Sequence, residues 1–353
     1  MKNQSLKGVI IGAGHFADIQ LEAWESVRGA QMIGIMSRTR EKSEILAEKY
    51  SLQVYEEFYE MIDAVKPDFV DICTPPETHF QYTRMAADLG IPIICQKPLA
   101  PTLEESKELV DYCLKKEVPL MINENWRWQG WYREIKKMIE KGMLGEVYHA
   151  YFAMRPGDGW GDEPYAVQPY FKNMKRFLLY ETGVHWIDTY RFLFGEIESV
   201  YCTTKKVNPV IAGEDLAIIH FNFQNNAVGI YDANRTTYMK QQRTPVYGWM
   251  TIEGTEGKLR LEEEGGIFFT PREGEEEEHI YDIPSGWKGG CAIATQQHFV
   301  DGLMKGTPYE SSGPEYLKSV LVVFACYESA KHNQVIKLKE FEKKYSIHGG
   351  NYR

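Results

Sequence analysis

The stretch that decides the fold is "VIIGAGHFADIQLEAW", residues 9 to 24. An apolar run breaks at Gly-Ala-Gly and continues with the spacing of a helix, which is the order strand, glycine turn, helix. Within a βαβ unit, the first glycine makes the tight turn and the second lets the backbone approach a pyrophosphate at the helix start. The same residues would also suit a tight turn between a strand and a helix with no ligand. The rest of the chain must therefore show whether the loop binds a dinucleotide. The candidate dinucleotide contacts in this stretch are Gly12, Gly14, His15 and Phe16.

Short apolar runs without polar alternation recur through the first third of the chain. Such runs are typical of strands buried on both faces, and they cover residues 6–12, 30–37, 68–75, 91–98 and 119–125. Helical stretches at 39–50 and 102–117 lie between them, the second with the capping box Thr102 to Glu105. Strands that alternate with helices predict a doubly wound parallel sheet. We therefore expect an α/β, NAD(P)-binding Rossmann domain over residues 1–125.

The pattern changes after residue 125. Strands such as "EDLAIIHFNFQ" (214–224) alternate apolar and polar residues, which indicates a sheet with one covered face and one wetter face. Helices are expected at about 180–194, 291–304 and 314–332, and a last strand at "QVIKLKEF" (334–341). The prediction for residues 126–353 is an α+β domain with a large open, mainly antiparallel sheet, for substrate binding and oligomerisation.

Composition limits the classes of partner. The chain has 353 residues, 43% hydrophobic and 25% charged, and its formal net charge of -10 opposes a nucleic-acid partner. No apolar stretch approaches the ~20 residues that span a bilayer, so no membrane partner is expected. The start "MKNQS" does not resemble a signal peptide, and six cysteines without a CxxC pair indicate reduced thiols. We expect a cytoplasmic protein.

The end of the second predicted strand bears on cofactor choice. An NAD site usually places Asp or Glu there, whereas this chain has Ser37 and Arg38, with Arg40 nearby. A hydroxyl and a guanidinium suit a 2′-phosphate, so NADP is favoured over NAD. The alternative interpretation is that these arginines are solvated side chains at a turn, with no role in cofactor binding.

Three later motifs make the pattern specific: "CTPPETH" (73–79), "CQKPLAPTLEE" (95–105) and "ETGVHWID" (181–188). Together with the glycine loop they closely resemble the Gfo/Idh/MocA oxidoreductase family, nearly end to end. "CQKP", "ENWRWQ" and "GED" (213–215) also resemble a sugar-dehydrogenase branch of that family that includes D-apiose dehydrogenases.

The resemblance implies roles for matching positions. Lys97 matches the lysine of the family's Glu-Lys-Pro, and Glu181 and His185 match its Asp-x-Gly-x-His. Two departures stand out, since Gln96 replaces a glutamate and Glu181 replaces an aspartate. The further cofactor contacts that we expect are Thr74, Pro75, His79, Gln96, Lys97 and Asn125.

The histidine motif can also be interpreted from its spacing. On a helix, Glu181, His185 and Asp188 share a face. Imidazole titrates near neutral pH, so His185 is a plausible general base that Glu181 supports. Lys97 would polarise the substrate oxygen, and the residues leave open which group takes the proton. A capped helix with a core histidine is the alternative. Without a third and fourth ligand, no metal site is expected.

The substrate side is expected in "NENWRWQGW" (123–131) and in the aromatic loop 155–171. Aromatic faces with interspersed carboxylates suit carbohydrate, although a packing loop has a similar composition. The candidate substrate contacts are Glu124, Trp126, Arg127, Arg155, Trp160, Tyr165 and Asp188.

These observations predict an NAD(P)-dependent dehydrogenase that acts on a secondary alcohol of a sugar or polyol. Two alternatives remain: a dinucleotide-sensing regulator of the same fold, and an enzyme that cycles a tightly bound cofactor internally. The family resemblance implies a homodimer or homotetramer formed through the C-terminal sheet.

Overall fold

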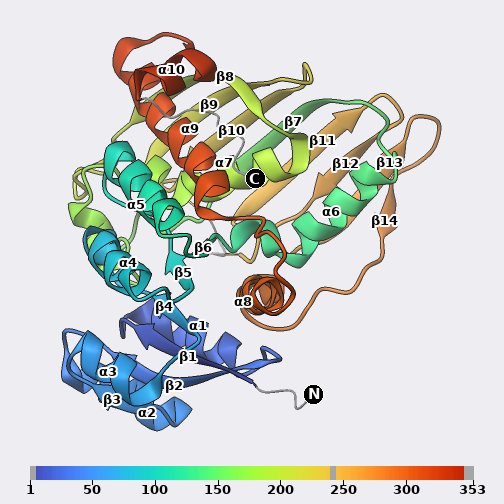
Figure 1. Ribbon diagram of the computed structural model, residues 1–353. Coiled ribbons are helices and arrows are strands. Elements are labelled where there is room, and N and C mark those ends of the chain that lie inside the picture. The colour runs from blue at the N-terminus through green and yellow to red at the C-terminus, as the bar shows by residue number, and fades with distance from the viewer. Residues whose placement is uncertain (1–4, 239–243, 346–353) are drawn as a thin grey trace. The chain divides into compact units, whose positions relative to one another are not determined.

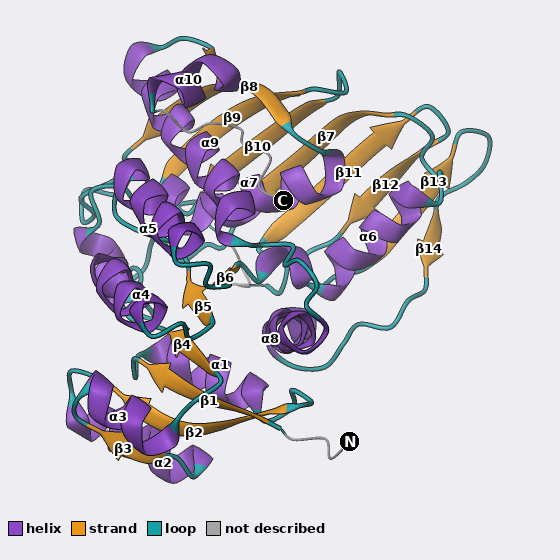
Figure 2. Ribbon diagram, viewed as in Figure 1, coloured by secondary structure: helices purple, strands orange, loops and turns teal. Residues whose placement is uncertain are grey.

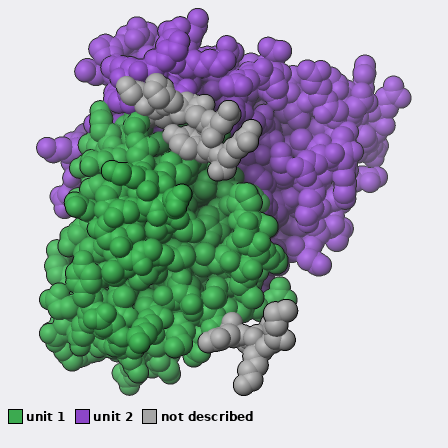
Figure 3. Space-filling view, in the orientation of Figure 1, with its two compact units in different colours: residues 1–128, 290–320 green, residues 129–289, 321–353 purple. Residues whose placement is uncertain are grey.

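The computed structural model describes residues 5–238 and 244–345. The chain divides into two compact units, shown in different colours in Figure 3. Unit 1 comprises Met1–Trp128 and Gly290–Val320, and unit 2 comprises Gln129–Gly289 and Leu321–Arg353. The expected linear boundary at residue 125 is therefore close to the first crossing, but residues 290–320 return to unit 1.

Unit 1 is built on a six-stranded parallel sheet in the order β3-β2-β1-β4-β5-β6 (Figure 1). Its strands are β1 (Leu6–Ile11), β2 (Ala30–Met36), β3 (Gln53–Tyr55), β4 (Phe69–Ile72), β5 (Ile93–Gln96) and β6 (Leu120–Asn123). The helices that connect them are α1 (His15–Trp24), α2 (Arg40–Tyr50), α3 (Phe58–Val65), α4 (His79–Asp88) and α5 (Leu103–Lys115). The doubly wound Rossmann prediction is confirmed. The short strand β3 was not predicted.

Burial explains why the strands read as unbroken apolar runs. Every residue of β4, β5 and β6 is buried, because helices cover both faces of a parallel sheet. The predicted capping box is present as well: the Thr102 hydroxyl accepts from the Glu105 N–H, and the Glu105 carboxylate accepts from the Thr102 N–H. This cap starts α5 directly after the loop that follows β5.

Two long helices lie late in the chain: α8 (Trp287–Lys305) and α9 (Gly313–His332). Within unit 1, Phe299 of α8 packs against Phe69 with ring centroids 5.4 Å apart. The Ser311 hydroxyl donates to the Ile122 carbonyl at 2.7 Å. The core of unit 1 therefore includes residues from the last fifth of the chain.

Unit 2 contains a nine-stranded sheet in the order β14-β13-β12-β11-β7-β10-β9-β8-β15 (Figure 2). Only the β10–β7 pair is parallel among the pairs of this sheet in the described chain. Its strands are β7 (Val147–Met154), β8 (Ile197–Lys205), β9 (Leu216–Phe223), β10 (Val228–Asn234), β11 (Gly248–Gly254), β12 (Gly257–Leu261), β13 (Ile267–Pro271), β14 (Glu277–His279) and β15 (Ile336–Lys337). The predicted large, mainly antiparallel sheet is confirmed.

Helices cover one face of this sheet: α6 (Gly130–Glu140), α7 (Val184–Phe194) and α10 (Leu338–Lys344) accompany it in Figure 2. Trp186 of α7 stacks on Tyr231 of β10 at 5.5 Å and contacts Phe152 of β7 at 5.1 Å. The opposite face carries partly exposed apolar side chains, among them Ile218 and Trp249. The period-2 pattern thus assigned the two faces correctly.

One prediction at the end of the chain was wrong. Residues 334–341 were expected to form a strand, but only Ile336–Lys337 pair with β8, and α10 begins at Leu338. Leu338 and Phe341 are both buried and lie three residues apart, which is helical spacing.

Among the described residues, no helix has both the length and the apolar character needed to cross a membrane.

Candidate active site

The glycine loop has the geometry of a dinucleotide cradle. Gly12 has φ +119°, and a Cβ there would lie 2.2 Å from the Cys73 carbonyl oxygen, so only glycine fits between β1 and the loop after β4. A Cβ at Gly14 would meet nothing within 4 Å. Gly14 is the N-cap of α1 and is exposed, as is His15, while Phe16 is half-buried. The open approach and the helix start fit a pyrophosphate.

Two alanine substitutions separate these glycine roles. Gly12→Ala should lower the free energy of unfolding by about 1–3 kcal/mol or more, because the position needs a positive φ and leaves no room for a methyl group. Gly14→Ala should fold normally but raise the Kd for a dinucleotide about tenfold, since its methyl group would occupy the open approach. Thermal melts and titration of protein fluorescence would measure the two effects. Unchanged affinity in Gly14→Ala would contradict the cradle.

Ser37 and Arg38 follow β2, at the same edge of the sheet as the glycine loop. The Ser37 hydroxyl donates to the Thr39 carbonyl at 2.9 Å and lies 2.7 Å from the Ser43 hydroxyl. Arg38 is exposed, whereas Arg40 pairs with the Glu44 carboxylate at 2.8 Å. Of these side chains, Arg38 is the cation best placed to meet a ligand from solvent.

Lys97 and Glu124 follow the last residues of two neighbouring strands. Gln96 of β5 pairs in register with Asn123 of β6, so the next residues along the strands, Lys97 and Glu124, emerge together at the carboxyl edge. Open α/β sheets bind ligands at this edge. Burial raises the pKa of Glu124 to about 7, and the charges of Lys97 and Arg127 oppose that rise. Lys97 therefore lies in the field of a carboxyl group that titrates near neutral pH.

Two buried amides mark the same edge. Asn123 is 1% exposed, and neither of its amide atoms has a hydrogen-bond partner among the described residues; the same holds for the side-chain oxygen of Asn125. An unsatisfied buried polar group costs about 1–3 kcal/mol, which a bound polar ligand would recover. Asn125 was predicted as a cofactor contact and Asn123 was missed. A polar residue that ends the apolar run "PLMI" was the available signal.

His79, predicted as a cofactor contact, is fully buried, and its two ring nitrogens lie 2.8 Å from the Thr74 carbonyl and 3.0 Å from the Leu99 carbonyl. Burial lowers its pKa, and these backbone contacts oppose the shift. His79 thus joins the loop after β4 to the loop after β5. Thr74 and Pro75 lie on the accessible side of that loop.

In unit 2, the helix predicted at 180–194 begins with a π-helical turn, Leu178–Gly183, and continues as α7. The Glu214 carboxylate accepts from the N–H groups of Phe177 and Leu179 and so anchors the start of the turn. The wider turn changes the spacing between Glu181 and His185 from that of an α-helix. Single π-helical turns are frequent at functional sites.

Arg235 is a functional candidate that the sequence reasoning missed. It follows β10, and its guanidinium donates to both oxygens of Asp158, at 3.1 and 2.6 Å, and to the Thr182 hydroxyl at 2.9 Å. The Thr182 hydroxyl in turn donates to the Glu181 carboxylate at 2.6 Å. Burial opposes the charge of Arg235, but Asp158 and Glu181 raise its pKa. The cation thereby fixes Glu181 through Thr182.

The position of Arg235 in the sheet offered a signal. Tyr231, Ala233 and Arg235 alternate along β10 and its continuation, and the first two are buried on the helix-covered face. An arginine on a covered face requires a buried anion. The partner, Asp158, lies 77 residues away, and the period-2 pattern alone does not identify it.

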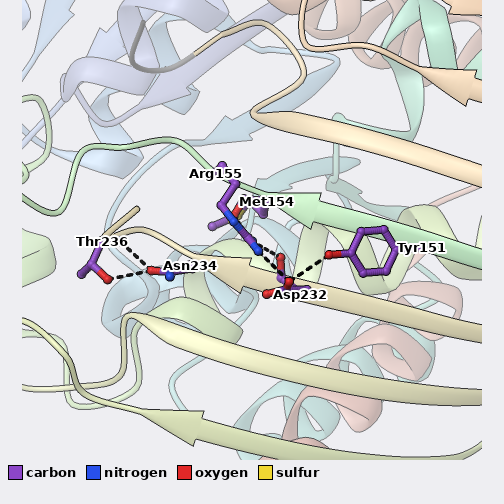
Figure 4. Close-up of polar contacts among 6 residues, drawn as sticks. All are labelled: Tyr151, Met154, Arg155, Asp232, Asn234 and Thr236. Carbon is purple, nitrogen blue, oxygen red and sulfur yellow. Dashed lines mark hydrogen bonds and ion pairs between the residues drawn. The ribbon is translucent and has the colours of Figure 1, made fainter. Parts of the chain in front are cut away.

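Arg155, which was predicted as a substrate contact, lies on the other face of the unit 2 sheet, away from α7. Figure 4 shows Arg155 and Tyr151 converging on Asp232: the guanidinium donates to the carboxylate at 2.6 Å and the phenol at 2.9 Å. Phe152, the neighbour of Tyr151, packs under Trp186 of α7 on the covered face. Since side chains alternate along a strand, Arg155 is on the face opposite to the helix that carries His185.

The remaining substrate candidates divide by accessibility. Tyr165 is 2% exposed and packs edge-on to Phe177, with Arg235 over its ring, so part of the loop that carries it packs within unit 2. Trp160 in the same loop is 44% exposed. Four candidates are buried, Glu124, Trp126, Arg127 and Asp188. Arg127 also donates to the Glu310 carbonyl at 3.2 Å.

The acidic and histidine side chains do not form a metal centre in the part of the chain that the structure describes: no group of three or more His, Cys, Asp or Glu residues there could hold an ion. The six cysteines are all buried.

Comparison with known proteins agrees with this geometry. Residues 6–124 match the family model "Oxidoreductase family, NAD-binding Rossmann fold", and residues 132–260 match "GFO/IDH/MocA C-terminal domain". A D-apiose dehydrogenase from Rhizobium rhizogenes is 32% identical over 96% of this chain and 99% of its own. Another from Paraburkholderia graminis is 28% identical over 95% and 90%.

A solved structure is similar over the same extent. An oxidoreductase from Agrobacterium radiobacter, in complex with NAD+, L-tartaric acid and magnesium, superposes with a TM-score of 0.89 at 32% identity. The match covers 95% of this chain and 99% of that one. With both family models and a full-length relative in agreement, the chain belongs to the Gfo/Idh/MocA family of oxidoreductases, with an NAD-binding Rossmann domain at its amino-terminal end.

Proposed function

We propose that this protein is an NAD(P)-dependent dehydrogenase that oxidises a secondary alcohol of a sugar, with D-apiose and related aldoses as the first candidates. The observation that carries the proposal is Lys97 at the carboxyl edge of the parallel sheet, the edge to which the glycine loop of β1 also opens. The full-length similarity to two D-apiose dehydrogenases supports the substrate class.

The residues of unit 1 fit a dinucleotide. Gly14 leaves an open approach at the start of α1, and the unpaired amide atoms of Asn123 and the unpaired side-chain oxygen of Asn125 offer hydrogen bonds at the sheet edge. A bound nicotinamide ring would supply the hydride acceptor. Thr74 and Pro75, in the loop after β4, and Gln96, the last residue of β5, complete the proposed contacts.

Protein side chains would take up the proton that the substrate hydroxyl releases. The Lys97 ammonium would donate a hydrogen bond to the substrate oxygen and stabilise the charge that develops on it. His185 is the second side chain proposed to handle the proton, as a general base. Glu181 would support the charged imidazole, and its own orientation is set by the bond from Thr182. Trp160 is the accessible aromatic candidate for the sugar.

We further propose that NADP is preferred, with Arg38 as the side chain that meets the 2′-phosphate. Arg38 is exposed after β2, and Arg40 beside it is engaged by Glu44 and Glu56. A guanidinium suits a phosphate through paired N–H donors. The similar structure with NAD+ bound keeps NAD as the competing cofactor.

One assay tests substrate and cofactor together. Reduced-nicotinamide absorbance at mildly alkaline pH, across aldoses, ketoses and cyclic polyols, should show turnover with a sugar and a higher kcat/KM with NADP. Arg38→Ala should then reduce the NADP preference about tenfold and leave NAD turnover unchanged. An unchanged ratio in Arg38→Ala would refute its role.

Two other outcomes would favour the alternatives. Dinucleotide binding without turnover on any sugar would support a sensing regulator. Stoichiometric cofactor that remains through purification, with little bulk reduction, would support internal cycling of a tightly bound cofactor.

We also propose that two or four copies associate through the open face of the unit 2 sheet. Ile218, Val228 and Trp249 are 36%, 40% and 36% exposed there, which is unusual for a large apolar sheet surface in solvent. Sedimentation velocity should give a dimer or tetramer, and Trp249→Glu should dissociate it. A monomeric wild-type protein would overturn this assembly.

A further inference from the structure

A chain of buried hydrogen bonds connects α1, β4 and β5 in unit 1. It begins at Asp71 of β4, which is fully buried. The Gln20 side-chain amide donates to both Asp71 oxygens, at 2.8 and 2.7 Å, and the Trp24 indole donates to one of them at 2.8 Å. Gln20 and Trp24 lie four residues apart, one turn along α1. Burial raises the pKa of Asp71 to about 7, and the bonds from Trp24 and Gln20 oppose that rise.

The chain continues to the candidate active site. The Gln96 side-chain amide donates to the Gln20 carbonyl oxygen at 2.8 Å. The Gln96 carbonyl oxygen then accepts the peptide N–H of Lys97, also at 2.8 Å. Two side-chain amides thus link a buried carboxylate to the backbone of the residue that we assign to proton handling.

The direction of every bond is fixed by the two ends. An ionised carboxylate can only accept, and a peptide N–H can only donate. Asp71 therefore holds the NH2 group of Gln20, which turns the Gln20 oxygen toward Gln96. Gln96 must then present its NH2 group to Gln20 and its oxygen to Lys97. No other orientation of the two amides satisfies all the groups.

We propose that Gln20 and Asp71 are positioning residues for Lys97: they fix the Gln96 amide, and through it the backbone of Lys97, at the carboxyl edge of the sheet. The proposal rests on the function proposed above for Lys97. It also accounts for glutamine at position 96, because a carboxylate there would meet the Gln20 oxygen while Asp71 holds the Gln20 NH2 group.

Charge exchange tests this logic. In Gln96→Glu, Gln20 stands between two carboxylates and its oxygen must face one of them. In Asp71→Asn, the new amide places an NH2 group against the Gln20 NH2 group, because Gln20 contacts both oxygens of Asp71. In Asp71→Asn/Gln96→Glu, Gln20 reverses, and the new carboxylate accepts from both Gln20 and the Lys97 N–H. The reversed Gln20 oxygen still contacts both polar atoms of the new amide, one of which is an oxygen. The double variant should therefore recover the loss caused by Gln96→Glu and keep only the loss caused by Asp71→Asn.

The measurement is kcat and KM of the full chain at mildly alkaline pH, above the pKa of Asp71. Each single variant should lose about ten- to a hundredfold in kcat, the effect of small misplacement of a reacting group, with little change in KM. The double variant should return to within about threefold of Asp71→Asn. Losses that simply multiply in the double variant, or single variants with full activity, would overturn the proposal.

Trp24→Phe is the matched control. It removes one donor to Asp71 but leaves both amides of the chain in place, so it should lower the melting temperature without lowering kcat. If Trp24→Phe lowers kcat as much as Asp71→Asn does, the network acts through general stability and the positioning role is refuted.

Hydrogen exchange at the Lys97 amide gives a readout that needs no substrate. Protection of this N–H should fall in both single variants, and in the double variant it should recover from the level of Gln96→Glu to that of Asp71→Asn. Restored protection in a protein that turns over no sugar would uphold the positioning and refute the proposed function. If the wild-type protein oxidises a sugar but the double variant does not recover protection of the Lys97 N–H, the positioning role is refuted and the proposed function stands. If a single variant fails to fold, recovery of folding and protection in the double variant supports the proposal, and its failure overturns it.

Discussion

Replacing Lys97 with alanine is expected to lower kcat by about 10²- to 10⁴-fold, the range for loss of a positioned proton-transfer group. The fold should persist, because Lys97 is only half-buried at a strand end. Dinucleotide affinity should change little, because the glycine loop and Asn123 remain. Steady-state kinetics with the best sugar, together with titration of protein fluorescence by the dinucleotide, would separate turnover from binding.

Two further lysine variants sharpen the Lys97 test. Lys97→Arg keeps the positive charge but not the proton chemistry, so it should recover little activity. Lys116→Ala removes a lysine at the end of α5 that pairs with Asp88, and it should behave as wild type. Near-normal turnover in Lys97→Ala would refute the assignment of Lys97.

Replacing Arg235 with methionine should lower the free energy of unfolding by about 3–5 kcal/mol, the effect of leaving one charge of a buried pair without its partner. Arg235 is 2% exposed and holds Asp158, itself 9% exposed, through two bonds. The Phe171 and Phe177 rings lie 4.9 and 5.0 Å from the guanidinium and would lose their cation contact. Denaturant unfolding followed by tryptophan fluorescence would measure the loss.

Arg260→Met provides the surface comparison in the same unit. Arg260 pairs with Glu276 at 2.8 Å and with Glu262, but its side chain is 31% exposed. Pairs this exposed contribute about 0–1 kcal/mol, so the midpoint should hardly move. Equal losses in the two variants would contradict the distinction between buried and exposed pairs. The Arg235 variant should also lose activity, because Thr182 then lacks the donor that fixes it beside Glu181.

The fold could be predicted from the sequence wherever burial produces a clear hydrophobic pattern. Runs such as residues 91–98 contain no polar alternation because β5 is covered on both faces. The hydrophobic pattern of residues 334–341 is ambiguous. "VIKL" suits a strand, and the helix is favoured by the burial of Leu338 and Phe341. The π-helical turn before α7 was also beyond the pattern, since its anchor, Glu214, lies more than thirty residues away.

The candidate site came from motif positions: Lys97, Glu181 and His185 were assigned because their neighbours in sequence form a recognisable pattern. Arg235 and Gln20 were not identified, because their partners, Asp158 and Asp71, lie 77 and 51 residues away. Arg155 and Tyr165 were assigned from composition, which shows neither the sheet face nor the burial of a side chain.

The return of residues 290–320 to unit 1 has a consequence for how the chain is made. Phe299 packs against Phe69, and Ser311 bonds to Ile122, so the Rossmann core lacks part of its packing until these residues exist. Unit 2 also takes residues from beyond this return, since Leu321–Arg353 belong to it. Neither domain can therefore finish folding until the chain is almost complete. A fragment that stops at residue 128 is expected to expose Phe69 and aggregate.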